Sequence, residues 1–129
     1  MREQIKKFLN SPAFAVVGAS SNRHKYGNKV LLCYLRHQKT VYPVNPHEDQ
    51  IEGLSCVKDL MNLPASVKSL SIVTPPFITL TIVTQAIEKG IQNIWMQPGE
   101  EHQTAIDNCL KHNINIIANG PCILQELGC

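Results

Sequence analysis

The sequence lacks both an excess of charge and a long apolar run, and these absences exclude several classes of protein. Its 129 residues carry 12 Lys and Arg against 10 Asp and Glu, so the formal net charge is only +2. Such a small charge argues against binding to nucleic acid or to a membrane surface. No apolar stretch has the length of a membrane span, and none follows the charged residues 1–7 as in a signal peptide. We therefore expect a cytoplasmic protein.

Closely spaced cysteines are also absent. The five cysteines are an odd number and contain no C-x-x-C motif, so they predict neither a disulfide framework nor a zinc site. The five histidines are scattered, and no pair stands at metal-ligand spacing near carboxylates or cysteines. We expect free thiols, as in a reducing cytosol, and no bound metal.

No set of residues forms a recognisable catalytic group. Glu100 and Glu101 fit the first turn of a helix, where acidic side chains stabilise the dipole, better than a pair of catalytic carboxylates. Cys122 follows a predicted strand and is either a reactive thiol or a structural cysteine. No Ser-His-Asp or Cys-His arrangement is apparent, so the sequence favours a binding protein over an enzyme.

Short apolar segments alternate with helical periodicities, which predicts one α/β domain over residues 1–129. The pattern indicates a doubly wound, mostly parallel five-stranded sheet of Rossmann-like topology, with helices on both faces. Pro43 cannot donate to a ladder and places its strand near an edge. Residues 47–56 are expected to be a loop, and the chain beyond residue 118 a short tail. The expected strands are 13–17, 40–44, 69–73, 93–96 and 115–118, and the expected helices are 3–10, 26–38, 57–62, 77–88 and 101–112.

In such sheets, ligands bind beyond the carboxyl ends of the strands, where the strand order reverses. The loop after the first strand begins at Gly18, which permits a tight turn, and continues with small polar residues toward the N-terminus of a helix. Free backbone N–H groups at a helix N-terminus form an anion site, and Arg23 and Lys25 add two cations. The alternative is a helix-capping loop with solvated basic residues. The position after a buried strand favours a phosphate.

Two features disfavour a nicotinamide dinucleotide. The second glycine of G-x-G-x-x-G is replaced by Ser20, and Asn45-Pro46-His47 stands where an acidic residue would hold the ribose.

After the third strand, Thr74-Pro75-Pro76 offers carbonyls, a hydroxyl and an apolar wall. This segment suits an adenine edge or a pantetheine arm, or is simply a rigid connection to the next helix.

These residues resemble the small CoA-binding domain proteins, which are relatives of the nucleotide-binding domain of the succinyl-CoA synthetase alpha subunit. The resemblance runs from about residue 11 to residue 124. It is carried by five motifs in order: Val17-Gly18-Ala19-Ser20 with Gly27, Val44-Asn45-Pro46 with Ile51-x-Gly53, Thr74-Pro75-Pro76, Ile94-Trp95-Met96-Gln97-Pro98-Gly99, and Asn119-Gly120-Pro121-Cys122-Ile123.

The resemblance implies a module that binds coenzyme A or an acyl-CoA. It implies that the loop at residues 18–22 contacts the diphosphate of the ligand and that Lys25 contacts a further phosphate. The synthetase subunit has a further domain with a phosphorylated histidine, which these residues do not include, so we do not expect ligase activity. The alternatives are a small NAD(P)-binding redox or regulatory protein and an interaction protein that has lost its ligand. A homodimer or a partner protein is also possible. The expected cofactor-binding residues are Gly18, Ala19, Ser20, Ser21, Asn22, Arg23, Lys25, Asn45, Pro46, Thr74, Pro75, Pro76, Phe77, Gln97 and Asn119.

Overall fold

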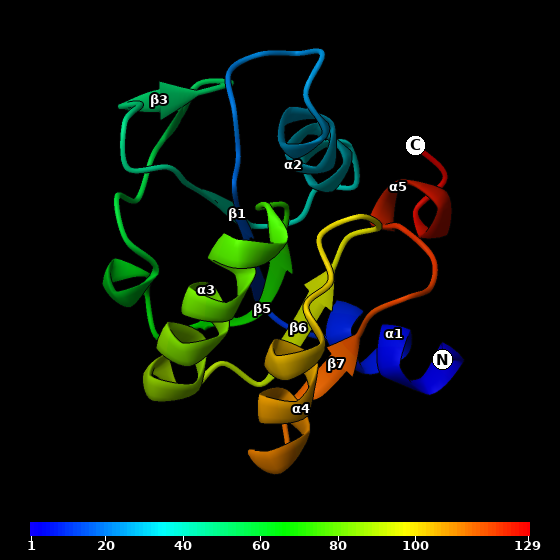
Figure 1. The fold of residues 1–129 in the computed structure, drawn as a ribbon. Coiled ribbons are helices and arrows are strands. Elements are labelled where there is room, and N and C mark those ends of the chain that lie inside the picture. Colours follow the sequence, from blue (N-terminus) through cyan, green and yellow to red (C-terminus); the bar gives the residue numbers. More distant parts are fainter.

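A parallel sheet with helices on both faces forms the centre of the molecule (Figure 1). The computed structural model describes all 129 residues. The sheet has five strands in the order β2-β1-β5-β6-β7, and every neighbouring pair is parallel. The predicted Rossmann-like fold is therefore confirmed. The strands are β1 (Ala13–Val17), β2 (Val41–Val44), β5 (Val67–Ile72), β6 (Asn93–Met96) and β7 (Asn115–Ile117).

Helices alternate with these strands along the chain. They are α1 (Arg2–Leu9), α2 (Tyr26–Arg36), the short 3-10 helix η1 (Leu60–Asn62), α3 (Pro76–Lys89), α4 (Gln103–Lys111) and α5 (Ile123–Glu126). None of them is long and apolar enough to cross a membrane.

The strand order reverses between β1 and β5. From β1 the chain passes to β2 on one side, whereas β5, β6 and β7 follow one another on the other side. The carboxyl ends of β1 and β5 therefore form the switch point at which doubly wound sheets hold ligands. Strand β2 is an edge strand, as Pro43 predicted.

Two hydrophobic clusters cover the two faces of the sheet. Helices α3 and α4, in front of the sheet in Figure 1, pack Val83 and Cys109 into one cluster. Helices α1, α2 and α5 contribute Phe8, Tyr34 and Ile123 to the other. Strands apolar on both faces are what this two-sided burial requires. Trp95 lies fully buried against Phe8, with ring centroids 5.3 Å apart, so it is a core residue.

The helix expected at 101–112 begins two residues late. His102 is its N-cap, and the His102 side chain accepts a hydrogen bond from the backbone N–H of Ala105 at 3.3 Å. Glu100 and Glu101 therefore precede the first turn, which corrects the expectation that they stabilise the helix dipole. The Glu101 carboxylate accepts instead from the N–H of Gly99, at 2.9 Å.

The segment expected to be a loop contains a small antiparallel hairpin. It consists of β3 (Gln50–Ile51) and β4 (Leu54–Ser55). Between them, Glu52 and Gly53 have φ angles of 49° and 81°, the pair of positive values that a tight hairpin turn requires. The tail likewise contains α5, which packs against α2.

The expectation of five free thiols is wrong for two cysteines. Cys33 in α2 and Cys129 form a disulfide across a sequence separation of 96, with Cα atoms 5.9 Å apart. No spacing pattern marks such a pair because only the fold brings its members together. Cys56, Cys109 and Cys122 are free. The disulfide also removes the thiol argument for a reducing compartment.

Candidate functional site

A hollow of about 510 Å³ opens at the switch point of the sheet. Its walls are the loops that follow β1, β2, β5 and β6, together with the start of α2. A second hollow of about 290 Å³ shares Gly18, Asn45 and Thr74 with it and continues past Pro46 to Ile78 in α3. The first hollow is lined by Gly18, Ala19, Ser20, Lys25, Tyr26, Gly27, Asn45, His47, Glu48, Val73, Thr74, Pro75 and Glu100.

Two glycines let the backbone pack closely at the base of this hollow. Gly18 has a φ of 96°, and a Cβ on it would overlap the carbonyl of Val73 at the end of β5. A Cβ on Gly27 would in turn overlap the carbonyl of Gly18. Helix α2 therefore begins directly against the turn after β1, and the loop between them is held at the floor of the hollow. Gly27 was singled out only through the family resemblance.

Backbone donors gather beside these glycines. The N–H groups of Ala19 and Ser20 donate to no acceptor within the protein. The N-cap of α2, Lys25, makes no side-chain capping hydrogen bond, and the first turn carries no acidic residue. The positive end of the helix dipole thus faces the hollow without a counter-charge from its own turn. This arrangement can bind an anion, and a phosphate fits it.

Glu48 is an acidic side chain at the rim that the sequence analysis did not assign. Its carboxylate accepts a hydrogen bond from the N–H of Ser21 at 3.0 Å. The hydrogen bonds from Ser21, and then the charge of Lys25, hold the pKa of Glu48 below its usual value. Ser21 therefore already has a partner, whereas Ala19 and Ser20 do not. The only feature of the sequence that could have placed Glu48 at this rim is its position, four residues after the end of β2.

The side chain of Asn45 holds two loops together and has no unpaired polar group to offer a ligand in the hollow. Its amide nitrogen donates to the carbonyl of Ala19 at 2.9 Å. Its amide oxygen accepts from the N–H groups of His47 at 2.7 Å and Glu48 at 3.0 Å. Both ends of this side chain are engaged, so Asn45 ties the loop after β2 to the loop after β1.

Arg23 and Asn22 lie away from the hollow. The guanidinium of Arg23 forms two hydrogen bonds of 3.0 Å with the carboxylate of Glu52 in the hairpin turn, and these raise the pKa of Arg23 and lower that of Glu52. The Asn22 side chain accepts from the N–H of His24. Of the two predicted cations, only Lys25 lines the hollow.

Gln97, expected among the cofactor-binding residues, is fully buried and does not line the hollow. Its amide oxygen accepts from the N–H of Ile123 at 3.0 Å and from the hydroxyl of Tyr26 at 3.4 Å. Burial, and then a hydrogen bond with Cys122, raises the pKa of Tyr26 above its usual range. Cys122 therefore lies beside the Tyr26 hydroxyl, half-buried at the start of α5.

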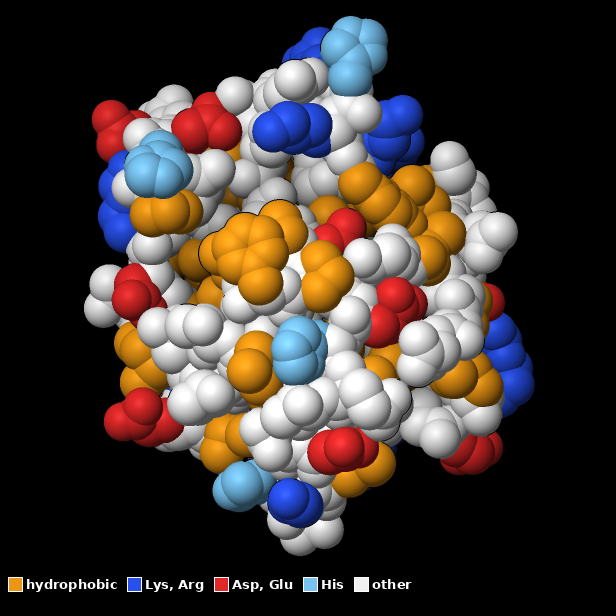
Figure 2. Space-filling model, viewed as in Figure 1, with side chains coloured by type: hydrophobic (Ala, Val, Ile, Leu, Met, Phe, Trp, Pro, Cys, Tyr) orange, Lys and Arg blue, Asp and Glu red, His pale blue; other side chains and the backbone are white.

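The segment after β5 forms one wall of the hollow. The hydroxyl of Thr79 lies 3.0 Å from that of Thr74, and it donates to the carbonyl of Glu100 at 3.0 Å, so the loops after β5 and β6 are joined. Pro75 lines the hollow, and Phe77, 75% exposed, stands beyond it at the start of α3. Figure 2 shows hydrophobic side chains gathered over this part of the surface.

Asn119 is distant from the switch point. It follows β7, the edge strand opposite β2, and has a left-handed φ of 56°. A Cβ on its neighbour Gly120 would touch the side chain of Met1. The motif at 119–121 therefore shapes the turn beside the chain start, and Asn119 does not line the hollow.

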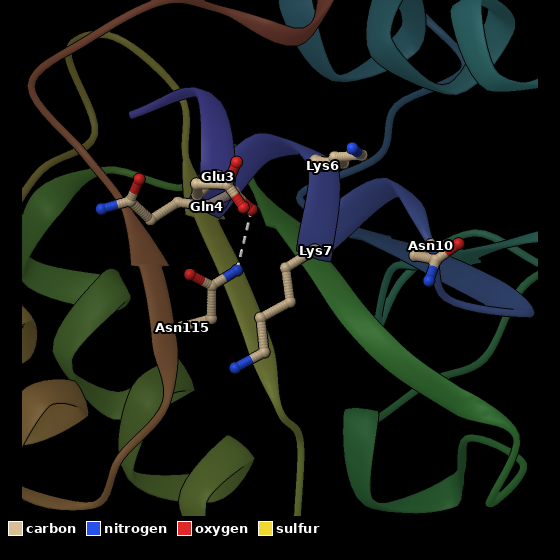
Figure 3. Close-up of a pocket in the computed structure, with 6 residues that line it drawn as sticks. All are labelled: Glu3, Gln4, Lys6, Lys7, Asn10 and Asn115. Atoms are coloured by element: carbon tan, nitrogen blue, oxygen red, sulfur yellow. Dashed lines mark hydrogen bonds between the residues drawn. The ribbon is translucent and has the colours of Figure 1, made fainter.

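Another hollow, of about 440 Å³, lies at the opposite edge of the sheet (Figure 3). It contains no hydrophobic side chain and is lined mostly by α1. The amide of Asn115 there donates to the backbone carbonyl of Gln4 at 2.9 Å, and Figure 3 shows Lys6 and Asn10 lying apart from Asn115. This hollow lies at the start of β7, away from the carboxyl ends of the strands, and gathers no set of groups that would hold a ligand.

Comparison with known proteins links this geometry to a family. Residues 12–127 match the family model described as "CoA binding domain". Over 88 residues, 67% of the chain, the sequence is 31% identical to acetate–CoA ligase [ADP-forming] II subunit alpha of Pyrococcus furiosus, of which the match covers 19%. The chain thus spans about a fifth or less of the curated relatives it matches.

Two solved structures share the fold over nearly their whole length. A conserved hypothetical protein of Pyrococcus furiosus superposes with a TM-score of 0.84 at 38% identity, covering 88% of this chain and 97% of its own. A hypothetical protein of Pyrococcus horikoshii OT3 superposes with a TM-score of 0.90 at 27% identity, covering 97% of this chain and 87% of its own.

Proposed function

Because the chain belongs to the CoA-binding domain family, we propose that it holds coenzyme A or an acyl-CoA in the hollow at the β1/β5 switch point, as one domain over residues 1–129. The observation that supports this site is the uncapped start of α2. Two unpartnered backbone N–H groups and the positive end of the helix dipole meet there, at the place where Gly18 and Gly27 bring the backbone close. The CoA diphosphate is the anionic group of the ligand that suits this floor.

Lys25 supplies a flexible, positively charged side chain to the proposed site. It is exposed, lines the hollow and lies one residue before α2. A lysine ammonium on a flexible stem can reach a phosphate that the backbone does not. Lys25 is therefore the residue proposed to contact the diphosphate or the further phosphate of CoA, and it takes this role without Arg23.

Phe77 supplies an apolar surface for the uncharged part of the ligand. With Ile78, which is 37% exposed, it extends the wall formed by Pro75. The second hollow next to it is lined by Val17, Val44, Leu60, Ile78 and Ile82 among others. The pantetheine arm is the part of CoA that this surface fits, and burial of its methylenes would contribute about 0.8 kcal/mol each.

A calorimetric titration with CoA, acetyl-CoA, NAD and NADP tests the proposal. We expect saturable binding of CoA at one site per chain, weakened about tenfold or more by Lys25→Ala, since a hydrogen bond to a charged group contributes about 1.5–3 kcal/mol. Lys29→Ala is the matched control, because Lys29 is exposed one turn further along α2 and lies outside the hollow. Equal losses in the two variants would argue against the assigned site.

A second matched pair of variants tests the apolar wall. Phe77→Ala should weaken CoA binding, whereas Leu110→Ala, on the 59% exposed Leu110 of α4, should not. Binding of NAD or NADP in place of CoA would favour the alternative of a redox or regulatory protein. No heat and no thermal shift with any nucleotide would contradict the proposed function. A homodimer or a protein partner stays a prediction from the sequence.

A further inference from the structure

The end of α2 brings three metal-ligating side chains together, whereas the hollow at the switch point is lined by the start of the same helix. Cys33 and His37 stand one helical turn apart, so they share a face. Cys33 is fully buried, and His37 is exposed at the C-cap of the helix. Cys129 joins them from the other end of the sequence. The two sulfur atoms and a ring nitrogen of His37 all lie within 4.8 Å of one another.

The turn that follows α5 places Cys129. Gly128 has a φ of 71°, its N–H donates to the carbonyl of Gln125 at 3.3 Å, and the N–H of Cys129 donates to the carbonyl of Leu124 at 2.8 Å. These two bonds around a left-handed glycine form a Schellman motif. The reversal carries Cys129 back over α2, so its position is fixed by backbone hydrogen bonds as well as by the bond to Cys33.

We propose that Cys33, His37 and Cys129 form a zinc site when the two cysteines are reduced, and that formation of their disulfide releases the metal. Two thiolates and one imidazole are ligands that Zn²⁺ prefers, and three protein ligands leave the fourth tetrahedral position to water. A disulfide alone would need no histidine. The third ligand, aligned by helical spacing, is what distinguishes a metal site from a simple cross-link.

The surroundings favour the thiolate forms that a metal requires. Lys29 and Arg36 line the hollow beside Cys129, together with Leu124, and neighbouring cations stabilise a thiolate. Zn²⁺ bound by two thiolates and a neutral imidazole forms a complex without net charge. The complex therefore adds no net positive charge to this basic surface.

The exchange between the two states balances with a peroxide as the oxidant. The Zn–S bonds break, each sulfur gives up one electron, and the S–S bond forms. Zn²⁺ leaves without a change of oxidation state. Hydrogen peroxide takes up the two electrons with two protons, its O–O bond breaks, and two water molecules form. A thiol reductant reverses the step and restores both ligands.

Metal titration of the full chain tests the site. After treatment with a phosphine reductant and a chelator, both then removed under anaerobic conditions, the protein should bind one equivalent of Zn²⁺. Co²⁺ should give a thiolate-to-cobalt charge-transfer band and the visible spectrum of a tetrahedral site. Protein treated with hydrogen peroxide to form the disulfide should bind neither metal at this site.

Substitutions identify the ligands. His37→Gln should weaken Zn²⁺ binding by more than the roughly tenfold to hundredfold that loss of an outer partner costs, while the disulfide still forms. His112→Gln is the matched control, because His112 is the exposed C-cap of α4. Cys129→Ser should abolish the charge-transfer band, whereas Cys56→Ser should leave it unchanged.

Two results would overturn the proposal. One is a reduced protein that binds no Zn²⁺. The other is binding that is equally strong in His37→Gln and His112→Gln. Circular dichroism of each variant separates loss of the site from loss of the fold. The metal titration needs no nucleotide, so its outcome is independent of whether the proposed CoA site is correct.

Discussion

Gly27 packs directly against the carbonyl of Gly18, and a Cβ added to Gly27 would also lie 3.3 Å from the Cα of Ala19. Helix propensity alone favours alanine over glycine by about 1 kcal/mol. Overpacking a close contact costs about 1–3 kcal/mol and forces the backbone to shift. We expect Gly27→Ala to lower the free energy of unfolding in a urea titration and to weaken CoA binding, because the shift moves the Ala19 and Ser20 donors.

Gly53→Ala provides the comparison. Gly53 also needs a glycine, since its φ is 81°, but open space surrounds its Cβ position. This variant should lose stability through backbone strain alone and keep its CoA affinity. If Gly27→Ala proved as stable as the native protein, the close approach of α2 to the loop would not be a constraint.

The second prediction separates Arg23 from Lys25. Because Glu52 engages the guanidinium of Arg23, Arg23→Ala should leave the dissociation constant for CoA within about twofold, a change of less than 0.5 kcal/mol or so. The stability lost should be small, as for other exposed ion pairs. A tenfold loss of affinity in calorimetry would instead indicate that Arg23 contacts a phosphate of the ligand.

This ion pair also has a pH signature. Arg23, and then Asn28, lowers the pKa of Glu52 below the usual glutamate value of 4.5. The stability it contributes is present above that value and is lost as the pH falls through the lowered pKa. The difference in thermal midpoint between the native protein and Arg23→Ala should therefore be present at pH 7 and vanish in acid. A difference that grows in acid would contradict the pairing.

The third prediction concerns the disulfide. In the chain-entropy description, closing a loop of this length stabilises the fold by up to about 5 kcal/mol, and the bond here spans a separation of 96 residues. Cys129 is exposed, so Cys129→Ser removes the cross-link without leaving a buried cavity. In chelator, we expect the free energy of unfolding to fall by several kcal/mol.

Reduction of the native protein should give the same decrease, and Cys56→Ser should give little. An unfolding midpoint that does not respond to reductant would show that the bond is absent in solution or contributes nothing.

The fourth prediction uses Glu100, which lines the hollow. Burial, and then the neighbouring Glu101, raises the pKa of Glu100 above the usual glutamate value of 4.5. A raised carboxyl pKa means that this group favours the fold in acid and that the benefit is lost as the pH rises through the raised pKa. Glu100→Gln should therefore be more stable than the native protein at pH 7, and the gain should shrink toward pH 4. Glu88→Gln, on the exposed side of α3, is the control.

Thermal midpoints across this pH range provide the measurement. A Glu100→Gln variant less stable than the native protein at pH 7 would mean that the carboxylate makes a favourable contact there. In that case Glu100 would hold part of the loop after β6 in place through its charge.

The sheet was predictable because short segments rich in apolar residues, such as the fully apolar β1, alternate with helical periodicities. The predicted limits of β1 and β6 agree with the structure, and Pro43 identified β2 as an edge strand. Gly90 ends α3 in the left-handed conformation, with a φ of 87°, as glycines directly after helices commonly do. Each of these features depends on residues that are neighbours in sequence.

The features that the sequence did not reveal depend on distant pairs or on very short elements. Cys33 and Cys129 meet only after the whole chain has folded. The β3–β4 hairpin has strands of two residues, too short for an alternating pattern. Gln97 and Arg23 were expected at the ligand site from their chemistry, but each has a protein partner that sequence position does not disclose.

Within the proposed site, sequence order identified the correct loops more reliably than the correct side chains. Gly18, Ser20, Lys25 and Thr74 all line the hollow, because the carboxyl ends of neighbouring parallel strands must meet at one edge. Which side chains remain free there depends on hydrogen bonds between loops. Asn45, for example, uses both ends of its amide within the protein.

Arg2 in α1 pairs with Glu126 in α5, so the two ends of the described chain leave the molecule from one side (Figure 1). Neither residue 1 nor residue 129 lines the hollow at the switch point, which is formed largely by the loops after β1, β2 and β5. A tether, tag or fused protein attached at residue 1 would therefore leave the hollow facing solution. The fold is thus suited to immobilisation on a sensor surface, with its ligand face unobstructed.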